Sequence, residues 1–355
     1  MEEEKPLLQA MIPPLLDWFQ DHARSLPWRE DPQPYHVWIS EIMLQQTRVA
    51  AVLGYYARFL DRLPTVEALA KVPEQELLKL WEGLGYYNRA RNLQKAARKI
   101  CDELEGVFPS SYDRLLELPG IGEYTAGAIA SIAFGQPVPA VDGNVLRVIT
   151  RLTADRSDIG RPETKKAIRS ALEQIIPAAF PGRFNQALME LGALVCLPNG
   201  APLCRQCPLR ALCRARREEL IDQIPVKEKK KARRIQERKV CLIFHKGRIA
   251  LRRRPEEGLL AGLWEYPNFA PGEPGPEQWG LNCTAGRDGG AGKHIFTHIE
   301  WHMTALCMAA DSDRLPEGWV WADETALRER YPIPNAFACF REQAEAGLRG
   351  QIDFT

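Results

Sequence analysis

Four cysteines that lie within 18 residues constrain the fold of this chain more than any other feature. Cys196, Cys204, Cys207 and Cys213 follow the spacing C-x7-C-x2-C-x5-C. The chain starts with an acidic segment that lacks a basic stretch followed by a long apolar core, so we expect no export signal and a cytoplasmic location. In a reducing compartment, clustered cysteines bind metal more often than they form disulfides. The cluster therefore predicts a metal-binding loop.

The spacing of the cluster also indicates which metal it holds. Zinc sites usually contain two tight cysteine pairs that are separated by a dozen or more residues. Here one tight pair has a single thiol on each side, an arrangement that suits four thiolates around one iron–sulfur cubane. We expect an iron–sulfur cluster, and zinc is the alternative. The five other cysteines are expected to be isolated thiols.

The charge is distributed unevenly, although the net charge of the 355 residues is only +1. Residues 205–254 hold 18 Lys and Arg against 5 Asp and Glu, whereas residues 255–355 hold 7 against 16. A run of basic residues between 227 and 239 is either a solvated linker or a strap along a phosphate backbone. The near-neutral total therefore does not exclude a nucleic-acid partner. No apolar stretch is long enough to cross a membrane, so we expect no membrane contact.

The hydrophobic pattern changes along the chain. Apolar residues recur at helical spacing to about residue 222, and Pro and Gly separate the segments. We expect helices at 7–24, 37–63, 74–81, 89–104, 112–118, 124–134, 145–152, 162–176 and 185–195. After residue 239 the pattern favours strands at 240–244, 248–251, 296–308 and 319–321, helices at 324–329 and 335–346, and a loop at 271–292. The fold class is therefore multidomain, with an all-α domain followed by an α+β domain.

Two short motifs in the helical part are candidate functional sites. Leu118-Pro119-Gly120-Ile121-Gly122 lies between two helices, and its backbone N–H groups could bind a phosphate; a plain helix–helix turn is the alternative. Asp142 comes just before the next helix and could simply be its N-cap. In combination with the helices and the cysteine loop, the functional interpretation of both motifs is favoured over the structural one.

These motifs together resemble those of the helix-hairpin-helix DNA glycosylase superfamily and, within it, the adenine DNA glycosylases of the MutY family. The resemblance covers most of residues 1–225, and a further match at 258–267 resembles the C-terminal Nudix-like domain of that family. The segments that carry it are LPWR at 26–29, WISEIMLQQT at 38–47, WEGLGYY at 81–87, the hairpin, DGN at 142–144, FNQAL at 184–188, the cysteine loop and GLLAGLWEYP at 258–267.

The resemblance implies a domain organisation and a cofactor. It implies a glycosylase domain at 1–222, a basic linker at 223–238 and a lesion-recognition domain at 239–355. Inside the first domain it implies a six-helix barrel at about 27–137, with the hairpin at 118–122, and an iron–sulfur subdomain made of 1–26 and 138–222. The implied cofactor is one [4Fe–4S] cluster on the four cysteines, although the family has six residues between its first two ligands and this chain has seven.

The resemblance also implies a reaction, the removal of adenine mispaired with 8-oxoguanine or guanine by hydrolysis of the N-glycosidic bond after base flipping. Glu41 matches the general acid that protonates adenine at N7, and its apolar neighbours would raise its pKa. Asp142 matches the carboxylate that stabilises the cationic sugar, by charge or by a transient covalent bond. Tyr124 and Asn144 match residues that support that intermediate. Because position 124 is not the Schiff-base lysine of lyase-active relatives, we expect a monofunctional enzyme.

Further residues match DNA contacts of the family, and the partner implied is double-stranded DNA bound by a monomer. Gly120 and Gly122 belong to the hairpin. The residues implied for the adenine pocket are Leu26, Trp28, Arg29 and Gln186; those at the gap in the base stack are Gln46 and Thr47; those of the wedge beside 8-oxoguanine are Leu84, Gly85 and Tyr86. Thr297 and His298 match a Phe-Ser-His segment that contacts 8-oxoguanine, with Thr in place of Ser.

Three other functions remain as alternatives. An endonuclease III-like pyrimidine glycosylase is the nearest one, but Tyr124 and the extra domain disfavour it. A non-catalytic metal-containing DNA-binding module would not need both Glu41 and Asp142. A Nudix hydrolase would need an acidic helix after residue 267, and the sequence there, NFAPGEP, cannot form one. We therefore expect the second domain to read the lesion without hydrolysis.

Overall fold

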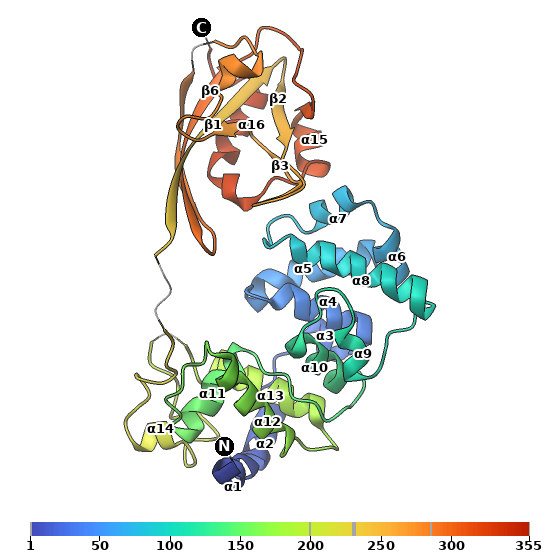
Figure 1. Ribbon diagram of the computed structural model, residues 1–355, viewed down its shortest axis with the longest axis vertical. Helices are drawn as coiled ribbons and strands as arrows, with labels where there is room; N and C mark the ends of the chain where they lie inside the picture. Colours follow the sequence, from blue (N-terminus) through green and yellow to red (C-terminus); the bar gives the residue numbers. More distant parts are fainter. Residues whose placement is uncertain (1, 199, 229–231, 285, 355) are drawn as a thin grey trace. The chain divides into compact units, whose positions relative to one another are not determined.

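The computed structural model describes residues 2–198, 200–228, 232–284 and 286–354. The chain forms two units, one made of Met1–Lys71 and Asn92–Lys229 and the other of Val72–Arg91 and Lys230–Thr355. Helices dominate the first unit (Figure 1). They are α1 (Lys5–Ala10), α2 (Ile12–His22), α3 (Pro27–Glu30), α4 (Pro34–Leu44), α5 (Val49–Arg62), α6 (Val66–Lys71), most of α8 (Asn88–Leu104), α9 (Tyr112–Leu116), α10 (Glu123–Ile132), α11 (Gly143–Thr153), α12 (Pro162–Glu173), α13 (Pro181–Leu194) and α14 (Arg214–Arg217).

Two of the long helices expected from the sequence are each split into two. The expected helix at 37–63 is interrupted between α4 and α5, where Gln46 has a left-handed backbone with φ of 60°. The expected helix at 7–24 is split at Met11, and α2 begins with Pro13 and Pro14 near its N-terminus, where their missing N–H groups cost nothing. Apolar residues continue across both breaks, so periodicity alone could not show them.

One hydrophobic core of the first unit lies between α2, α11 and α13. Leu15 from α2, Ile149 from α11 and Leu188 from α13 are all fully buried in one cluster. Hydrophobic burial of this kind contributes about 1.5–3 kcal/mol for each large aliphatic side chain. Cys196, Cys207 and Cys213 pack against the edge of the same cluster, so the core also supports the cysteine loop.

The second unit contains one sheet of seven strands, with the path β3-β2-β1-β6-β5, to which β4 pairs through β1 and β7 through β2 (Figure 1). The centre is the parallel pair β1–β6, which runs in register from Arg234 opposite Ile299 to Phe244 opposite Ala309. The strands are β1 (Arg234–His245), β2 (Arg248–Arg253), β3 (Trp264–Glu265), β4 (Asn268–Phe269), β5 (Arg287–Ile295), β6 (Ile299–Ala309) and β7 (Trp319–Ala322). The helices are α7 (Glu74–Leu80), α15 (Glu324–Glu329), α16 (Arg341–Leu348) and the 3-10 helices η2 (Pro276–Trp279) and η3 (Asn335–Phe340).

Alternating residues of β1 enter two different cores. Val240 and Leu242 pack in a cluster with Phe337 and Phe340 of η3, whereas Ile243 packs in a second cluster on the other side. Because successive side chains of a strand point to opposite faces, this alternation shows that both faces of the sheet are covered. The predicted α+β class is confirmed.

One expectation for this unit needs correction. The segment 271–292, expected as a loop, includes the start of β5 at Arg287, and its glycines concealed the strand. Gly292 is required there, since a Cβ would lie 2.4 Å from the Sγ atom of Cys339. The predicted linker 223–238 includes the first residues of β1, which begins at Arg234. Residues 229–231 of the basic run lie outside the described residues.

The segment that follows GLLAGLWEYP agrees with the expectation that it is not an acidic α-helix. It contains β4 and η2, and no α-helix occurs among its described residues between 268 and 284. In the described part of the chain, no helix is both long and apolar enough to cross a membrane.

We predict that Gly127→Ala destabilises the helical unit. Gly127 lies in α10, where a Cβ would stand 2.5 Å from the backbone oxygen of Pro139. Since backbone cannot move aside like a flexible side chain, the free energy of unfolding should fall by about 1–3 kcal/mol despite the better helix propensity of alanine. Denaturant unfolding followed by circular dichroism measures the change.

Gly54→Ala in α5 is the matched control. Only the end of the Arg58 side chain would approach the new Cβ, at 3.6 Å. This variant should be as stable as the parent or more stable. Equal stability of the Gly54 and Gly127 variants would contradict the packing described for α10.

Candidate active site and cysteine cluster

A cavity of about 940 Å³ lies within the first unit and is lined by α3, α4, α10, α13 and the start of α11. Its volume falls in the upper part of the range of roughly 300–1,000 Å³ that small-molecule sites occupy. Its lining includes ten residues expected from the sequence to act on the base or at the gap in the stack, together with Gly122 of the hairpin: Leu26, Trp28, Arg29, Glu41, Gln46, Thr47, Tyr124, Asp142, Asn144 and Gln186.

Glu41 lies on α4 and is only 5% exposed. Its Oε2 atom accepts a hydrogen bond of 2.5 Å from the hydroxyl of Tyr124, which projects from α10. Burial raises the pKa of Glu41 to about 7; the Tyr124 hydrogen bond opposes this, the charge of Asp142 adds to it, and the charge of Arg29 opposes it. The raised pKa agrees with the expectation from its apolar neighbours. A carboxyl with such a pKa is half protonated near neutral pH and can therefore donate a proton.

Asp142 is the N-cap of α11 and also lines the cavity. Its Oδ1 atom accepts from the backbone N–H of Val145 at 2.8 Å, and its Oδ2 atom accepts from the side-chain amide of Asn144 at 2.7 Å. Burial raises the pKa of Asp142, while these hydrogen bonds oppose the rise. Capping and a site role are thus compatible, because the cap fixes a carboxylate at the wall of the cavity.

Two polar side chains that the sequence analysis did not single out hold this wall in place. Asn185 is 1% exposed, and its amide oxygen accepts from the backbone N–H of Ala140, two residues before Asp142. Arg147 donates to Asn144 Oδ1 at 2.8 Å and to the backbone oxygen of Cys196 at 2.7 Å. Arg147 therefore connects the cavity wall to the cysteine loop.

A second missed group is the carboxylate of Glu190 on α13. It accepts hydrogen bonds from both Arg24 and Arg29, at 2.7 and 2.8 Å, and all three residues line the cavity. The side chain of Glu190 is 1% exposed. One sequence signal was present, because Gln186 and Glu190 stand four apart on α13 and so share one face of the helix.

The hairpin joins α9 to α10. Gly120 has φ of +78°, and a Cβ there would stand 2.6 Å from that of Asn92, so both backbone conformation and space favour glycine. Gly122 is exposed and is the N-cap of α10. The exposed N-terminus of this ten-residue helix is compatible with the expected phosphate contact.

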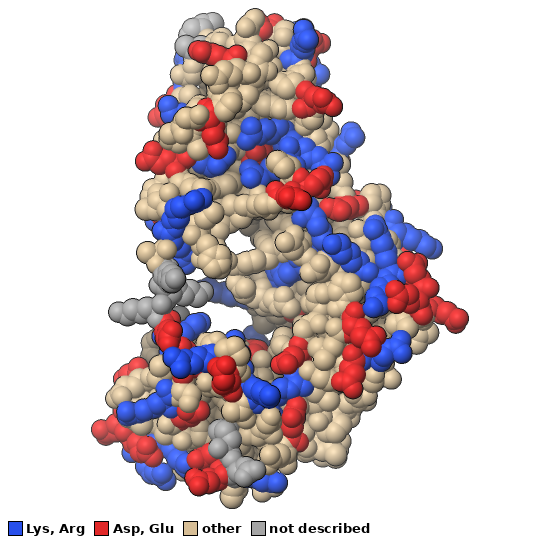
Figure 2. Space-filling model, in the orientation of Figure 1, with Lys and Arg blue, Asp and Glu red and all other residues tan. Residues whose placement is uncertain are grey.

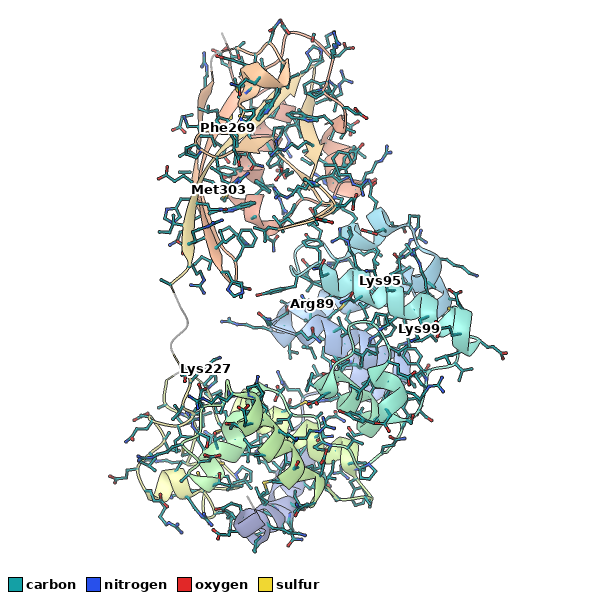
Figure 3. All side chains as sticks on the ribbon, viewed as in Figure 1. Arg89, Lys95, Lys99, Lys227, Phe269 and Met303 are labelled. Carbon is teal, nitrogen blue, oxygen red and sulfur yellow. The ribbon has the colours of Figure 1, made fainter. Side chains whose placement is uncertain are left out.

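The expected wedge residues belong to the second unit. Leu84 is buried, whereas Tyr86 is 51% exposed and has φ of +48°. Arg89 donates to the backbone oxygens of Leu84 and Gly85 at 3.0 and 3.1 Å, and its guanidinium lies over the Tyr86 ring at 5.7 Å. Arg89, which is labelled in Figure 3, thus holds the loop that exposes Tyr86.

Thr297 and His298 are both exposed and occupy the turn between β5 and β6. The preceding Phe296 packs edge-on against Trp301, with ring centroids 4.9 Å apart. The buried side of the turn is therefore anchored, and its exposed side is open to a ligand.

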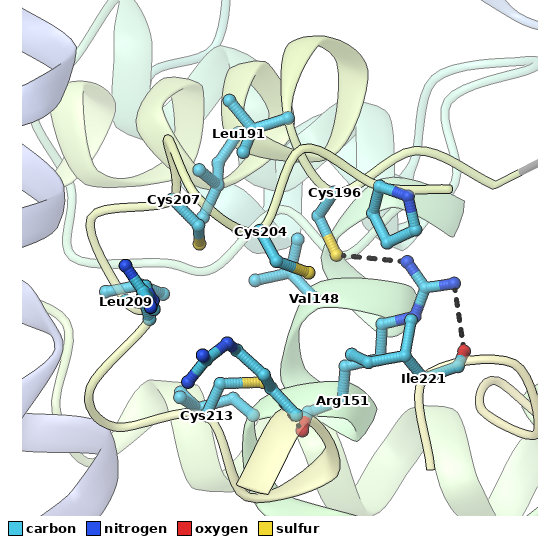
Figure 4. A pocket seen from close by; sticks show the side chains of 14 residues that line it. Val148, Arg151, Leu191, Cys196, Cys204, Cys207, Leu209, Cys213 and Ile221 are labelled. Atoms are coloured by element: carbon cyan, nitrogen blue, oxygen red, sulfur yellow. Dashed lines mark hydrogen bonds between the residues drawn. The ribbon is translucent and has the colours of Figure 1, made fainter. Parts of the chain in front are cut away.

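The four clustered cysteines line one cavity in the first unit, and Figure 4 shows their sulfur atoms directed into it. Burial raises the pKa of Cys207 to about 12, and the charges of the three other thiols add to this. Arg151 donates to Cys196 Sγ at 3.3 Å. Four thiols this close in an apolar cavity have the chemistry of a metal centre, because bound metal would offset the repulsion among thiolates.

Among the described residues, no group of three or more His, Cys, Asp or Glu side chains is arranged to hold a metal ion. The same four thiols nevertheless share one cavity. In a cubane each thiolate binds a different iron, so the sulfur atoms stand farther apart than around a single zinc ion. The residues present therefore fit a metal centre with four thiolate ligands.

Lys and Arg side chains are spread over the surface of both units, with Asp and Glu among them (Figure 2). Lys95 is exposed on α8, and Lys99 follows it one turn later (Figure 3). Not all of the Lys and Arg side chains in the basic block, residues 205–254, are available to bind a phosphate backbone. Arg238 donates to Asn268 Oδ1 at 2.7 Å and is 13% exposed, and Arg254 pairs with the buried Glu265 at 2.6 Å.

Comparisons with known proteins agree with this architecture. Residues 39–178 match the HhH-GPD superfamily of base excision DNA repair proteins, and residues 239–343 match the NUDIX domain family. A thermostable thymine-DNA glycosylase has a TM-score of 0.54 and 28% identity over 61% of this chain and 98% of its own. Endonuclease III in a non-covalent complex with DNA has a TM-score of 0.53 and 29% identity over the same shares. The fold is thus that of a helix-hairpin-helix DNA glycosylase followed by a Nudix-like domain.

Individual proteins that match most of this chain identify its family within the superfamily. The chain is 38% identical to human adenine DNA glycosylase over 86% of this chain and 69% of the human protein. It is 35% identical to the mouse adenine DNA glycosylase over 90% of this chain and 78% of the mouse protein. It is 39% identical to the adenine DNA glycosylase of Buchnera aphidicola strain Bp over 72% of each. The chain belongs to the adenine DNA glycosylase family.

Proposed function

We propose that the chain removes adenine mispaired with 8-oxoguanine or guanine in double-stranded DNA, by hydrolysis of the N-glycosidic bond and without a lyase step. The observation that carries this proposal is the buried pair of Glu41 and Tyr124 beside Asp142 in one cavity large enough for a flipped base. The two carboxyls differ in environment, as an acid and an electrostatic stabiliser should.

In the proposed reaction, side chains of this chain act in the protonation of adenine and in the stabilisation of the sugar cation. Glu41 donates its proton to N7 of adenine, and the C1′–N9 bond breaks with its electron pair moving to the base. Asp142, held by Asn144, stabilises the resulting oxocarbenium sugar by charge or by a transient bond. Water then adds at C1′ and loses a proton, which leaves adenine and an abasic site. Tyr124 orients Glu41 and cannot form the Schiff base of a lyase.

Other residues select the base and hold the DNA. Leu26, Trp28, Arg29 and Gln186 line the space for adenine, and the turn with Gln46 and Thr47 borders the base stack. Tyr86 is the aromatic wedge, exposed by the loop that Arg89 supports. We assign the turn with Thr297 and His298 to reading 8-oxoguanine.

We also propose one [4Fe–4S] cluster on Cys196, Cys204, Cys207 and Cys213, which would cross-link the loop after α13 to the core. The extra residue between the first two ligands lies in a loop, where an insertion is easily absorbed. We further propose the domain boundaries 1–222, 223–238 and 239–355, with β1 starting inside the middle segment. The enzyme is proposed to act as a monomer on genomic DNA in the cytosol.

Substrate choice tests the function. The protein should remove adenine from duplexes with adenine opposite 8-oxoguanine or guanine, and alkali should then cleave the abasic strand. Duplexes with an oxidised pyrimidine distinguish this function from the endonuclease III-like alternative, because only an enzyme of the latter kind would excise the pyrimidine. Borohydride should trap little covalent complex, because position 124 is tyrosine. Excision of the pyrimidine but not of adenine, or strong trapping, would overturn the proposal.

We predict that Glu41→Gln slows adenine excision by about 10²-fold or more, since a positioned general acid contributes roughly 10²–10⁴-fold. The single-turnover rate of the parent should fall as pH rises through about 7, because Glu41 acts only when protonated. Glu103→Gln, at an exposed site on α8, is the control and should keep the parental profile. Full activity in the Glu41 variant would refute its assignment as the acid.

The cofactor is tested by iron content. The purified protein should hold about four iron atoms and absorb in the visible range. Cys204→Ser should lose iron and lower the melting temperature, whereas Cys101→Ser, outside the cluster, should change neither. Zinc in place of iron, after anaerobic purification, would support the alternative metal.

A further inference from the structure

Glu190, Arg24 and Arg29 form a cluster of charged side chains at the wall of the cavity proposed to hold adenine. Glu190 is not among the residues that the family resemblance implied. Glu190 Oε2 accepts from Arg29 at 2.8 Å, and its other oxygen accepts from the backbone N–H and the guanidinium of Arg24, at 3.1 and 2.7 Å. Burial alone would raise the pKa of Glu190, but the hydrogen bonds from Arg24 and Arg29 outweigh it and lower the pKa to about 2. The carboxylate is therefore ionised at neutral pH.

Arg29 is the cation that matters for the chemistry. It is 15% exposed, lines the cavity on α3, and its charge opposes protonation of Glu41. Its guanidinium also lies over the Phe19 ring at 5.4 Å and donates to the backbone oxygen of Arg24. It is thus fixed in place and cannot swing into solvent.

The charged and titratable groups that line the cavity around Glu41 come from several elements. Tyr124 and Glu123 belong to α10, Asp142 to the start of α11, Arg29 to α3 and Glu190 to α13, while Arg24 precedes α3 and Arg48 precedes α5. Without Glu190, Arg24 and Arg29 would both stay charged in this space. Positive charge in the cavity that Glu41 also lines favours the ionised carboxylate, the form that cannot act as an acid.

We propose that Glu190 is a positioning residue of the excision reaction, which neutralises and aligns Arg29 so that the Glu41 carboxyl keeps its proton while the base is bound. The inference rests on the proposed function. It adds that the negative charge of Glu190 balances the positive charge of Arg29 in the cavity. Arg29 can then contact the base without removing the proton that the base must receive.

The test compares pH profiles of single-turnover adenine excision. In the parent, the rate falls as pH rises through the pKa of Glu41, and this falling part of the profile is the alkaline limb. Glu190→Gln should shift the alkaline limb to lower pH by roughly one unit, so that at a pH above the pKa of Glu41 the rate is about ten-fold lower than in the parent. Glu190→Asp retains the charge and should retain the position of the limb, even if the rate falls. Glu173→Gln removes a carboxylate from an ion pair with Arg169 on α12, outside the cavity, and should match the parent.

A double variant isolates the role of Arg29. The shift caused by Glu190→Gln should be much smaller when Arg29→Met is already present, because the cation to be balanced is gone. Should Glu190→Gln fail to fold alone, the comparison uses Glu190→Ala in its place, and Arg29→Met should move the alkaline limb to higher pH because a cation near Glu41 is lost.

An unmoved limb in both Glu190→Gln and Arg29→Met, or equal shifts with and without Arg29, would overturn the inference. These outcomes need a parent that excises adenine, so they differ from failure of the proposed function, in which the parent itself is inactive.

Discussion

The guanidinium of Arg147 makes the contacts on which the geometry of both centres depends. It donates to Asn144 Oδ1, to the backbone oxygen of Gly192 and to the backbone oxygen of Cys196. Asn144 in turn donates to Asp142, so one buried cation connects the Asp142 carboxylate at the cavity wall to Cys196, the first of the four clustered cysteines. Removing such a cation would leave several buried acceptors without a donor, which costs about 1–3 kcal/mol for each.

The cavity shows how a protein places several charges in little space without losing the protonated form of an acid. Glu41 is buried next to Tyr124 and Asp142, and burial favours its neutral form. Glu190 exposes only 1% of its surface, against 5% for Glu41, yet it stays ionised because two arginines bind it. The difference between the two glutamates lies in their partners and not in their depth, which is why residue type and hydrophobic context alone could not distinguish them.

Much of the fold could be predicted from the sequence, and the exceptions have physical causes. Turns that use glycine or proline were visible, as at Gly120, where both φ and space favour glycine. The break at Gln46 was not, because its apolar neighbours keep helical spacing while the backbone of one residue becomes left-handed. The strand β5 was hidden by glycines that the sheet needs for close packing against η3. Asp142 caps α11 and also lines the cavity, and its role in the reaction stays a prediction.

By itself, the sequence determined the helical and α+β halves and the clustered thiols, because these follow from periodicity and spacing. Its resemblance to a known family supplied the candidate acid and its partner carboxylate as predictions. Only the tertiary structure decided which charges balance one another. Arg24, Arg29 and Glu190 come from segments more than 160 positions apart in the chain, and Arg238 and Arg254 of the basic block are paired inside the second unit. Electrostatic interactions depend on distance in space and on burial, and neither quantity can be read along a chain.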